Sequence, residues 1–346
     1  MTSKQVLSSF LLSLTLFASD VDKAHLEKIS KKDNVDKAIE AGIKYLVKNQ
    51  IKADGSFEGL NRNNSTGLAC LALMASGHFP GQSKYGKYLT NGINYLIAIS
   101  KKNKGYFGKE GNGRMYVHGI CTLALTEAYG MLETPKENKR LKEALLPALE
   151  LIVRTQTLAK NTHFGGWHYM PKKQATADLS VSAWQILALR SAQNCKLPVP
   201  QKTIDNAITY VRKMFNPRDK AFTYNGNGAT TSMRSAGVVC MNVLGANQSE
   251  ADKLKITQSA SYLLGLNPAG GGSFYYQSYY VGSAANMMGG RYRETMIPKL
   301  EKVLLKLQVK NGSFSKHTGH QGGVYSTAFA VICLAIRYQY LPIYQE

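Results

Sequence analysis

The feature that most constrains the fold of this chain is a short pattern that returns along it. Each copy is a helix with apolar spacing, then Gly-x-aromatic or a degenerate form of it, a polar stretch, and a second, more apolar helix. The turn aromatics are Phe57, Phe107, Trp167, Phe222, Phe274 and Phe314. Their steps of about 40 to 60 residues are typical of two-helix repeats. We therefore expect about six helical hairpins between Val35 and the C-terminus.

The helices of each hairpin belong to two classes. In the first repeat, Ala38 and Leu46 follow helical spacing on one face, whereas residues 65–75 are apolar on nearly every face. Such alternation predicts an outer ring of helices around a buried inner ring. An open solenoid is the alternative, but it would end in a polar cap, and residues 337–344 are apolar and aromatic. We therefore predict an all-α (α/α)6 barrel, a closed toroid, whose weakest inner helix is 281–288.

Two segments carry a family resemblance. Residues 46–57 and 304–314 both read Leu-x3-Gln, three or four residues, then Gly-x-aromatic, with Gln50 and Gln308 ending the helices. This pattern resembles the QW repeat of squalene and oxidosqualene cyclases, and the hairpin array resembles the toroid of protein prenyltransferase β subunits. The resemblance implies that the Gln closes a helix end by hydrogen bonding while the aromatic stacks over the next turn. It implies a fold and leaves function open.

The key residues of both families are missing. The resemblance to cyclases implies a DxDD acid motif, and the nearest string here, residues 20–23, lies outside the repeats. The resemblance to prenyltransferases implies zinc held by a DxC pair and a His. Asp178 is in place, but Ser180 stands where Cys would be, and residues 325–327 replace the segment expected to supply His. His317 and His320 are spaced like a metal pair without an acidic or Cys partner, so we expect no metal and no cofactor.

The starts of the inner helices are the predicted site. If these helices run parallel, their N-termini meet at one mouth, where unpaired N–H groups and partial positive charge attract an anion. The residues there are polar and aromatic, and the aromatic faces suit a carbocation or an isoprenoid, with packing as the alternative role. The predicted ligand-binding residues are Arg114, Tyr116, Ser182, Arg234, Tyr279, Tyr280 and Tyr325.

Asp178 and His118 are the candidate catalytic residues. Asp178 is the only Asp placed on an inner helix, where desolvation would let it hold a proton as general acid or base; the alternative is a helix cap. His118 is a candidate proton shuttle, with a structural His as the alternative. Glu127, in the middle of an apolar helix, is a second buried carboxyl, which we expect to be paired with Arg or Tyr inside the wall.

The N-terminus resembles an export signal. Lys4 precedes a mostly apolar run, residues 6–18, and small residues at 18–19 offer a cleavage point. We predict a signal peptide over 1–19, a short linker over 20–34 and a single toroid domain over 35–346, in an exported protein; an uncleaved anchor is the alternative. The five cysteines are odd in number, and four lie in apolar helical stretches, which indicates core residues rather than disulfides.

The formal charge of +21, from 43 Lys+Arg against 22 Asp+Glu, favours acidic partners such as an anionic envelope polymer. We expect no nucleic acid, since the sequence has no nucleic-acid module and no continuous basic stripe. The leading hypothesis is a central cavity for an apolar or amphipathic ligand of isoprenoid or lipid type, with Asp178 as acid if the protein is an enzyme. The alternatives are a non-catalytic scaffold on envelope polymer and a glycan-active (α/α)6 enzyme, which needs two carboxylates.

Overall fold

The computed structural model describes residues 32–81, 83–109, 113–315 and 322–344, which belong to two units, Met1–Lys37 and Ala38–Glu346. In the first unit, the described residues begin helix α3 (Asn34–Lys48). Its start is capped by Asp33 and Asp36, since the backbone N–H of each donates to the carboxylate of the other, at 2.8 and 2.9 Å. The predicted signal peptide and most of the predicted linker lie outside the described residues.

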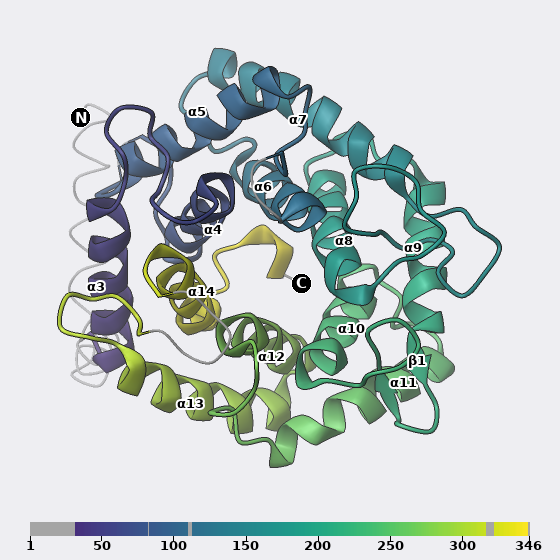
Figure 1. Ribbon diagram of the computed structural model, residues 1–346. Helices are drawn as coiled ribbons and strands as arrows, with labels where there is room; N and C mark the ends of the chain where they lie inside the picture. Colours follow the sequence, from purple (N-terminus) through teal and green to yellow (C-terminus); the bar gives the residue numbers. More distant parts are fainter. Residues whose placement is uncertain (1–31, 82, 110–112, 316–321, 345–346) are drawn as a thin grey trace, which may run out of the picture. The chain divides into compact units, whose positions relative to one another are not determined.

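The second unit holds a closed ring of helices inside an outer layer of helices (Figure 1). The inner helices are α4 (Arg62–Ala75), α6 (Arg114–Ala128), α8 (Leu179–Asn194), α10 (Thr231–Val243), α12 (Phe274–Met288) and α14 (Val324–Ala335). Each packs against the next, and α14 packs against α4. The outer helices are α3 from Ala38 onward, α5 (Gly86–Lys102), α7 (Pro135–Thr155), α9 (Gln201–Lys213), α11 (Glu250–Ala260) and α13 (Gly290–Leu307). The predicted α/α toroid is confirmed.

Burial explains why the two layers have different sequences. Inner helix α4 buries nearly all of its length, with Leu68 and Cys70 both 0% exposed. Outer helix α9 buries one stripe, including Ile204 and Tyr210, and exposes Lys202 on the other side. A helix covered on all sides requires apolar residues at every position, whereas a helix covered on one side requires them only every three or four residues.

The glutamines of the repeat close the ring through hydrogen bonds. The Gln50 side-chain amide donates to the carbonyls of Gly55, at 3.0 Å, and Tyr88, at 2.7 Å. Gln308 donates to Gly312, at 3.1 Å, and to Ala38, at 2.8 Å. Each amide therefore joins its own turn to the following outer helix, and Gln308 ties the last hairpin to the first. The resemblance implied that these glutamines close a helix end, whereas their amides donate to the turn and to the following outer helix.

A third glutamine makes the same bridge. Gln156 donates to the carbonyls of Gly165 and Thr203, both at 2.9 Å. The sequence pattern did not include it because a longer loop separates Gln156 from the turn. The fourth turn, which lacks a glycine, is a short antiparallel pair of β1 (Phe215–Asn216) and β2 (Ala221–Phe222). Lys220 takes the left-handed conformation there, with φ at 48°.

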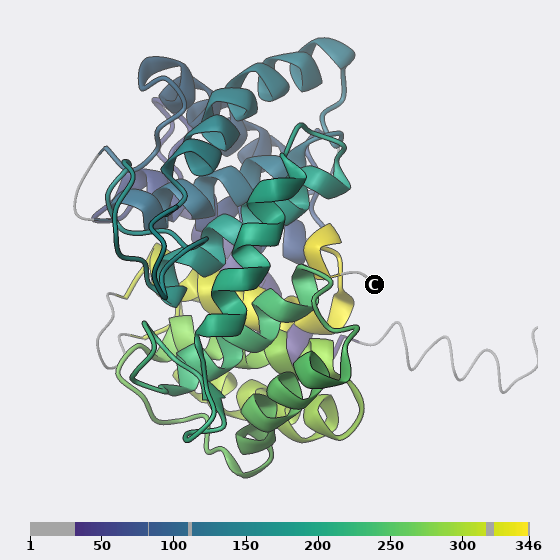
Figure 2. The ribbon, with the colours of Figure 1, turned by 90° about the vertical axis from the view of Figure 1, so that its right-hand side faces the viewer.

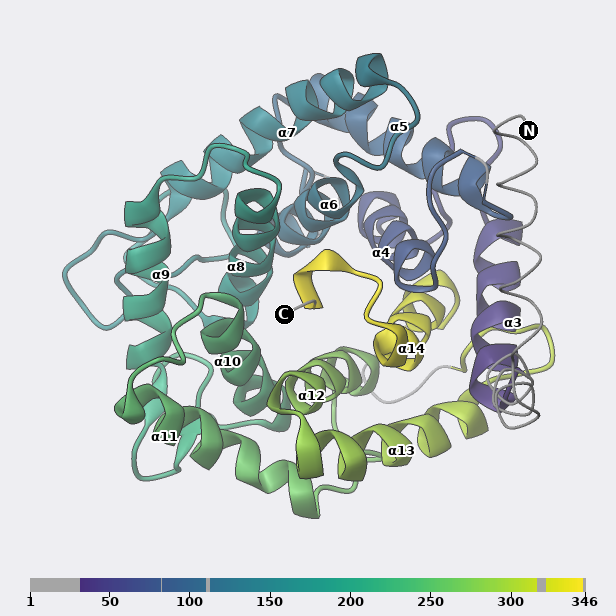
Figure 3. The same ribbon diagram turned by 180° about the vertical axis from the view of Figure 1, so that it is seen from behind.

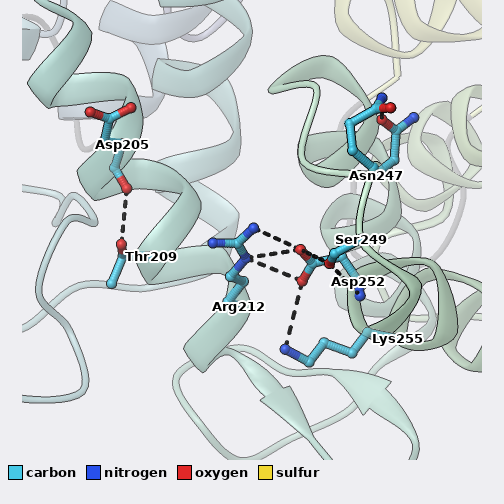
Figure 4. A network of polar contacts seen from close by, with 8 residues as sticks. Asp205, Thr209, Arg212, Asn247, Ser249, Asp252 and Lys255 are labelled. Atoms are coloured by element: carbon cyan, nitrogen blue, oxygen red, sulfur yellow. Dashed lines mark hydrogen bonds and ion pairs between the residues drawn. The ribbon is translucent and has the colours of Figure 1, made fainter.

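Outer helices α9 and α11 are joined by an ion pair (Figure 4). The Arg212 guanidinium donates to both carboxylate oxygens of Asp252, with a shortest distance of 2.7 Å. Ser249, the N-cap of α11, also donates to Asp252, at 2.8 Å.

None of the described helices is long and apolar enough to cross a membrane.

The sequence expectation about the start of one inner helix is wrong. Helix α12 begins at Phe274, seven residues before the predicted 281, so Tyr279 and Tyr280 lie inside the helix rather than at its start. Helix α14 ends at Ala335, and the chain continues as two short 3-10 turns, η2 (Ile336–Tyr338) and η3 (Pro342–Tyr344). The reversal after η2 uses a left-handed residue, Gln339, with φ at 53°.

Residues 336–344, the C-terminal tail, fold into the ring of inner helices (Figure 3). Leu341 is 3% exposed, Ile343 5% and Tyr344 7%. The buried residues of the tail are therefore covered by the ring that the tail enters, whereas the sequence predicted that closure of the barrel would cover them. From the side, the tail lies at the face opposite the long loops that precede α8 and α10 (Figure 2).

Candidate functional site

The start of α8 holds the most distinctive carboxyl group at the N-terminal mouth, the end of the ring where the inner helices begin. Asp178 is the N-cap of α8 and is only 3% exposed. Its Oδ1 accepts hydrogen bonds from the Val181 N–H, at 2.9 Å, and from the Ser180 hydroxyl, at 2.5 Å. Its Oδ2 has no hydrogen-bond partner in the described part of the chain. One oxygen thus caps the helix, and the other is available to carry a proton.

Four half-buried tyrosines lie at this mouth and are called the tyrosine group below: Tyr116, Tyr169, Tyr224 and Tyr276. Of these, Tyr224 and Tyr276 are close enough to Asp178 for its charge to raise their pKa. The Tyr116 ring lies 5.5 Å from that of Tyr169 and 6.2 Å from that of Tyr276. The hydroxyls of Tyr169 and Tyr224 are 3.4 Å apart, and Tyr276 donates to the Ser180 carbonyl at 3.5 Å. Two inner-helix starts and two loops therefore bring aromatic faces together next to the start of α8.

Burial controls the electrostatics of this site. It raises the pKa of Asp178, against the opposing effects of hydrogen bonds from Ser180 and Val181 and of nearby His168. It likewise raises the pKa of Tyr116 and Tyr276 well above the usual value. The tyrosines therefore stay neutral, and the carboxyl holds its proton to a higher pH than an exposed Asp. This arrangement suits a proton donor beside an apolar reactant.

The middle of the ring is packed with aromatic side chains. Trp184 stacks on Tyr279 with ring centres 5.1 Å apart, and Phe329 lies 5.7 Å from Tyr279. Trp184 and Phe329 are each 1% exposed, and Tyr279 is 2% exposed. The hydroxyl of Tyr344, in the tail, donates a hydrogen bond to the hydroxyl of Tyr279. At this level of the ring, the aromatic side chains therefore pack against one another and against the tail.

Ser182 and Arg234 occupy positions in the wall. The Ser182 hydroxyl accepts from the Trp167 N–H at 2.8 Å, just as Thr66 accepts from Phe57 and Thr327 from Phe314. This contact recurs in three repeats and anchors their turns to the inner helices. The guanidinium of Arg234 lies over the ring of Tyr262, at 5.4 Å from its centre. Both predicted binding residues therefore have structural partners.

His118 faces the outer layer. Its Nε2 is 3.1 Å from the Ala148 carbonyl of α7, its ring stacks on Phe107, and it is 0% exposed. Burial lowers the pKa of His118 to about 3, so the imidazole is neutral. This placement favours the structural alternative over a proton shuttle. Arg114 is exposed beside the site, within 2.9 Å of the Met170 sulfur.

The other residues singled out from the sequence lie deeper or at the edge. Tyr279 and Tyr280 belong to the packed middle, and Tyr325 is half-buried with its ring 5.0 Å from Phe329. Glu127 is 2% exposed and accepts from Ser191 and from the tail N–H of Ile343, at 3.3 Å. The expected Arg or Tyr partner of Glu127 is replaced by a serine and the backbone.

Sequence reasoning missed Tyr169 and Tyr224 as members of the site. Both lie in loops, outside the helical periodicity on which the site prediction rested. Loop hydrogen bonds bring them in: the Tyr169 carbonyl accepts from Met115 N–H, at 3.2 Å, and the Tyr224 carbonyl accepts from Leu179 N–H, at 2.8 Å. The available signal was the aromatic residue in the loop before each inner helix.

The described residues contain no cluster of three or more His, Cys, Asp or Glu suited to a metal. Ser180, which stands where the zinc-binding families carry Cys, donates its hydroxyl to Asp178 instead. Its hydroxyl is a poorer zinc ligand than a thiolate. His317 and His320 lie outside the described residues.

The fold defines the class of this protein, an α/α toroid. No family model and no curated protein matches the sequence. Among solved structures, it is similar to the GH76A α-1,6-mannanase of Salegentibacter sp. HEL1_6, with a TM-score of 0.64 and 12% identity over 88% of this chain and 99% of that one. A type II terpene cyclase of Scytonema, in complex with geranylgeranyl dihydroxybenzoate, has a TM-score of 0.60 and 13% identity over 90% and 98%. A GH76 α-mannanase of Bacteroides thetaiotaomicron has a TM-score of 0.60 and 13% identity over 90% and 97%. At these identities the likeness concerns the fold.

Proposed function

We propose that this chain is an exported toroid that binds an apolar ligand of isoprenoid type at its N-terminal mouth, with Asp178 as the proton donor. The observation that carries the proposal is a buried acid with one uncommitted oxygen beneath the half-buried tyrosine group. A neutral carboxyl can protonate an alkene, and the faces of neutral tyrosines stabilise the resulting cation. Loss of a proton elsewhere on the substrate then completes an isomerisation.

The comparison with the terpene cyclase supports this proposal at the level of the fold, since that protein has an isoprenoid substrate. The comparison with mannanases supports the glycan-active alternative equally at that level. Glycoside hydrolysis normally needs two carboxyl groups, one on each side of the scissile bond. Among the described residues, Asp178 is the carboxyl whose charge affects the pKa of Tyr224 and Tyr276. A site with one carboxyl group therefore favours protonation of an alkene over hydrolysis of a glycosidic bond.

The experiment is to incubate the purified protein with farnesol and geranylgeraniol in heavy water and to analyse the products by mass spectrometry. Proton-initiated cyclisation adds one deuterium and releases one hydrogen, so a product with one deuterium and a new retention time is expected. The Asp178→Asn variant keeps a side-chain oxygen to cap α8 and loses the acid. We expect it to react about a hundredfold more slowly or worse.

The matched control is Thr230→Ala, which removes the N-cap of neighbouring helix α10, where the Thr230 hydroxyl accepts from Met233 at 3.3 Å. It should keep the activity. Equal loss in both variants would mean that Asp178 acts only as a cap. Absence of any converted or bound isoprenoid, together with hydrolysis of α-1,6-mannan, would replace the proposal by the glycan-active alternative.

The scaffold alternative rests on the net charge of +21. It predicts binding to anionic envelope polymer that weakens with salt and is unchanged by Asp178→Asn. Cosedimentation with isolated envelope fractions at low and high salt measures this directly. Binding that is absent, or insensitive to salt, would count against it.

A further inference from the structure

A pocket lies at the end of the ring opposite Asp178. This end, the C-terminal mouth, is where the inner helices end. The pocket has a volume of about 330 Å³. Arg190 of α8, Asn242 of α10 and Asn286 of α12 line one side, and the C-terminal tail lines the other with Gln339 and Tyr344. A pocket of this size is within the range that holds small organic molecules.

The tail forms a fixed wall of this pocket. Ile343 donates its N–H to Glu127 at 3.3 Å, and the Tyr344 hydroxyl bonds to that of Tyr279. Gln339 reaches across to the Asn286 side-chain oxygen at 3.4 Å. Because these contacts reach inner helices, the pocket exists before any ligand arrives.

The Asn286 amide nitrogen and the Arg190 guanidinium give the pocket uncommitted hydrogen-bond donors. The Asn242 oxygen already accepts from Asn247, at 3.1 Å, and the Asn286 oxygen accepts from Gln339. The Asn286 amide nitrogen and the Arg190 guanidinium have no hydrogen bond or ion pair in the described part of the chain. No Asp or Glu lines the pocket. A ligand that satisfies these groups must present oxygen acceptors, and negative charge improves the match.

Apolar groups fill the rest of the lining. Val243, Met287 and Ile343 face the pocket, which is much larger than a bare inorganic ion. The partial negative charge at the ends of α10 and α12 opposes an anion at this mouth. Direct hydrogen bonds from a guanidinium to a carboxylate are charge-assisted and bidentate, and so outweigh it.

We propose that this pocket binds a small organic carboxylate, with the carboxylate against Arg190 and Asn286 and the apolar body against Val243, Met287 and Ile343. The site does not depend on the function proposed for Asp178, which lies at the start of α8, whereas Arg190 lies near the end of the same helix.

Isothermal titration calorimetry with hexanoate and benzoate tests the proposal, with hexanamide and inorganic phosphate as comparison probes. We expect both carboxylates to bind and the neutral amide and phosphate to bind at least about tenfold more weakly. The variant Arg190→Gln should weaken hexanoate binding about tenfold or more. The matched control is Arg154→Gln, which removes the same charge from an exposed site on α7 outside the pocket.

A second variant, Asn286→Asp, keeps the side-chain size and places a negative charge opposite the ligand, so it should also abolish binding. The Asp178→Asn variant should bind hexanoate like the parent protein. The proposal is overturned if neither carboxylate binds, if phosphate or hexanamide binds as tightly as hexanoate, or if Arg154→Gln weakens binding as much as Arg190→Gln. Circular dichroism confirms that each variant is folded before titration.

Discussion

The buried carboxyl of Glu127 makes a quantitative prediction about stability and pH. Burial raises the pKa of Glu127 from 4.5 to about 7, against hydrogen bonds from Ser191 and Ile343 that lower it. In the unfolded chain the carboxyl releases its proton near pH 4.5, whereas the folded protein retains it to about pH 7. Stability from this group is therefore complete below the unfolded pKa and is lost as the pH rises through the folded pKa. The difference corresponds to about 3 kcal/mol.

The perturbation is Glu127→Gln, which keeps the shape of the side chain and removes its titration. Between pH 4.5 and pH 8, the parent protein should lose about 3 kcal/mol of unfolding free energy relative to the variant. Urea unfolding followed by circular dichroism gives the unfolding free energy of each protein at the two pH values. The double difference is the change between the two pH values in the parent minus the same change in the variant, so the contributions of all other titrating groups cancel. The variant should be the more stable protein at pH 8.

The control is Glu143→Gln on outer helix α7, where the side chain is exposed and has no hydrogen bond or ion pair in the described part of the chain. This variant makes the same chemical change at an exposed position and so gives the reference for Glu127→Gln. A double difference for Glu127→Gln below about 1 kcal/mol, or one equal to that of Glu143→Gln, would refute the reasoning that desolvation governs this carboxyl.

Two further changes test the outer layer and the turns. Replacement Arg212→Ala leaves the Asp252 side chain, 4% exposed, with only Ser249 and a lysine 3.7 Å away, and should cost about 1–2 kcal/mol at pH 7. Arg212 and Ser249 hold the pKa of Asp252 below its usual value despite burial. The cost of losing Arg212 should therefore shrink in acid, where Asp252 is protonated. An equal cost at pH 7 and pH 3 in urea unfolding would contradict this. Replacement Gly165→Ala should cost about 2 kcal/mol or more, because φ is +94° and the new Cβ would lie 1.9 Å from the Asn206 carbonyl oxygen. Gly270→Ala, with no atom within 4 Å of the added Cβ, is its control in thermal unfolding, and equal melting temperatures would disprove the argument.

The architecture followed from local patterns. Apolar residues on every face in residues 65–75, against one apolar stripe in the preceding helix, require one helix to be surrounded and the other to lie outside. The Gln-to-Gly bridge of Gln50 and Gln308 was also predictable, because both partners lie within a few residues along the chain. Such features depend on neighbours in sequence, and one sequence is enough to show them.

The site depended on contacts between distant segments. Ser182 and Asp178 lie four residues apart on the same helix start, yet one anchors the Trp167 backbone and the other presents a free oxygen to the tyrosine group. Tyr224 reaches the site through a loop whose path is fixed by its own backbone hydrogen bonds. Periodicity places a residue on a helix, but it does not decide which neighbour occupies its polar atoms.

The chain end shows the same division. The sequence indicated that residues 337–344 are apolar and aromatic, and within them Leu341, Ile343 and Tyr344 are buried. Only the tertiary structure decided that they fold back between the inner helices, give Glu127 a backbone partner and form the wall of the pocket at Arg190. Hydrophobicity is a property of each residue alone, whereas the surface that covers it is set by the closed ring as a whole.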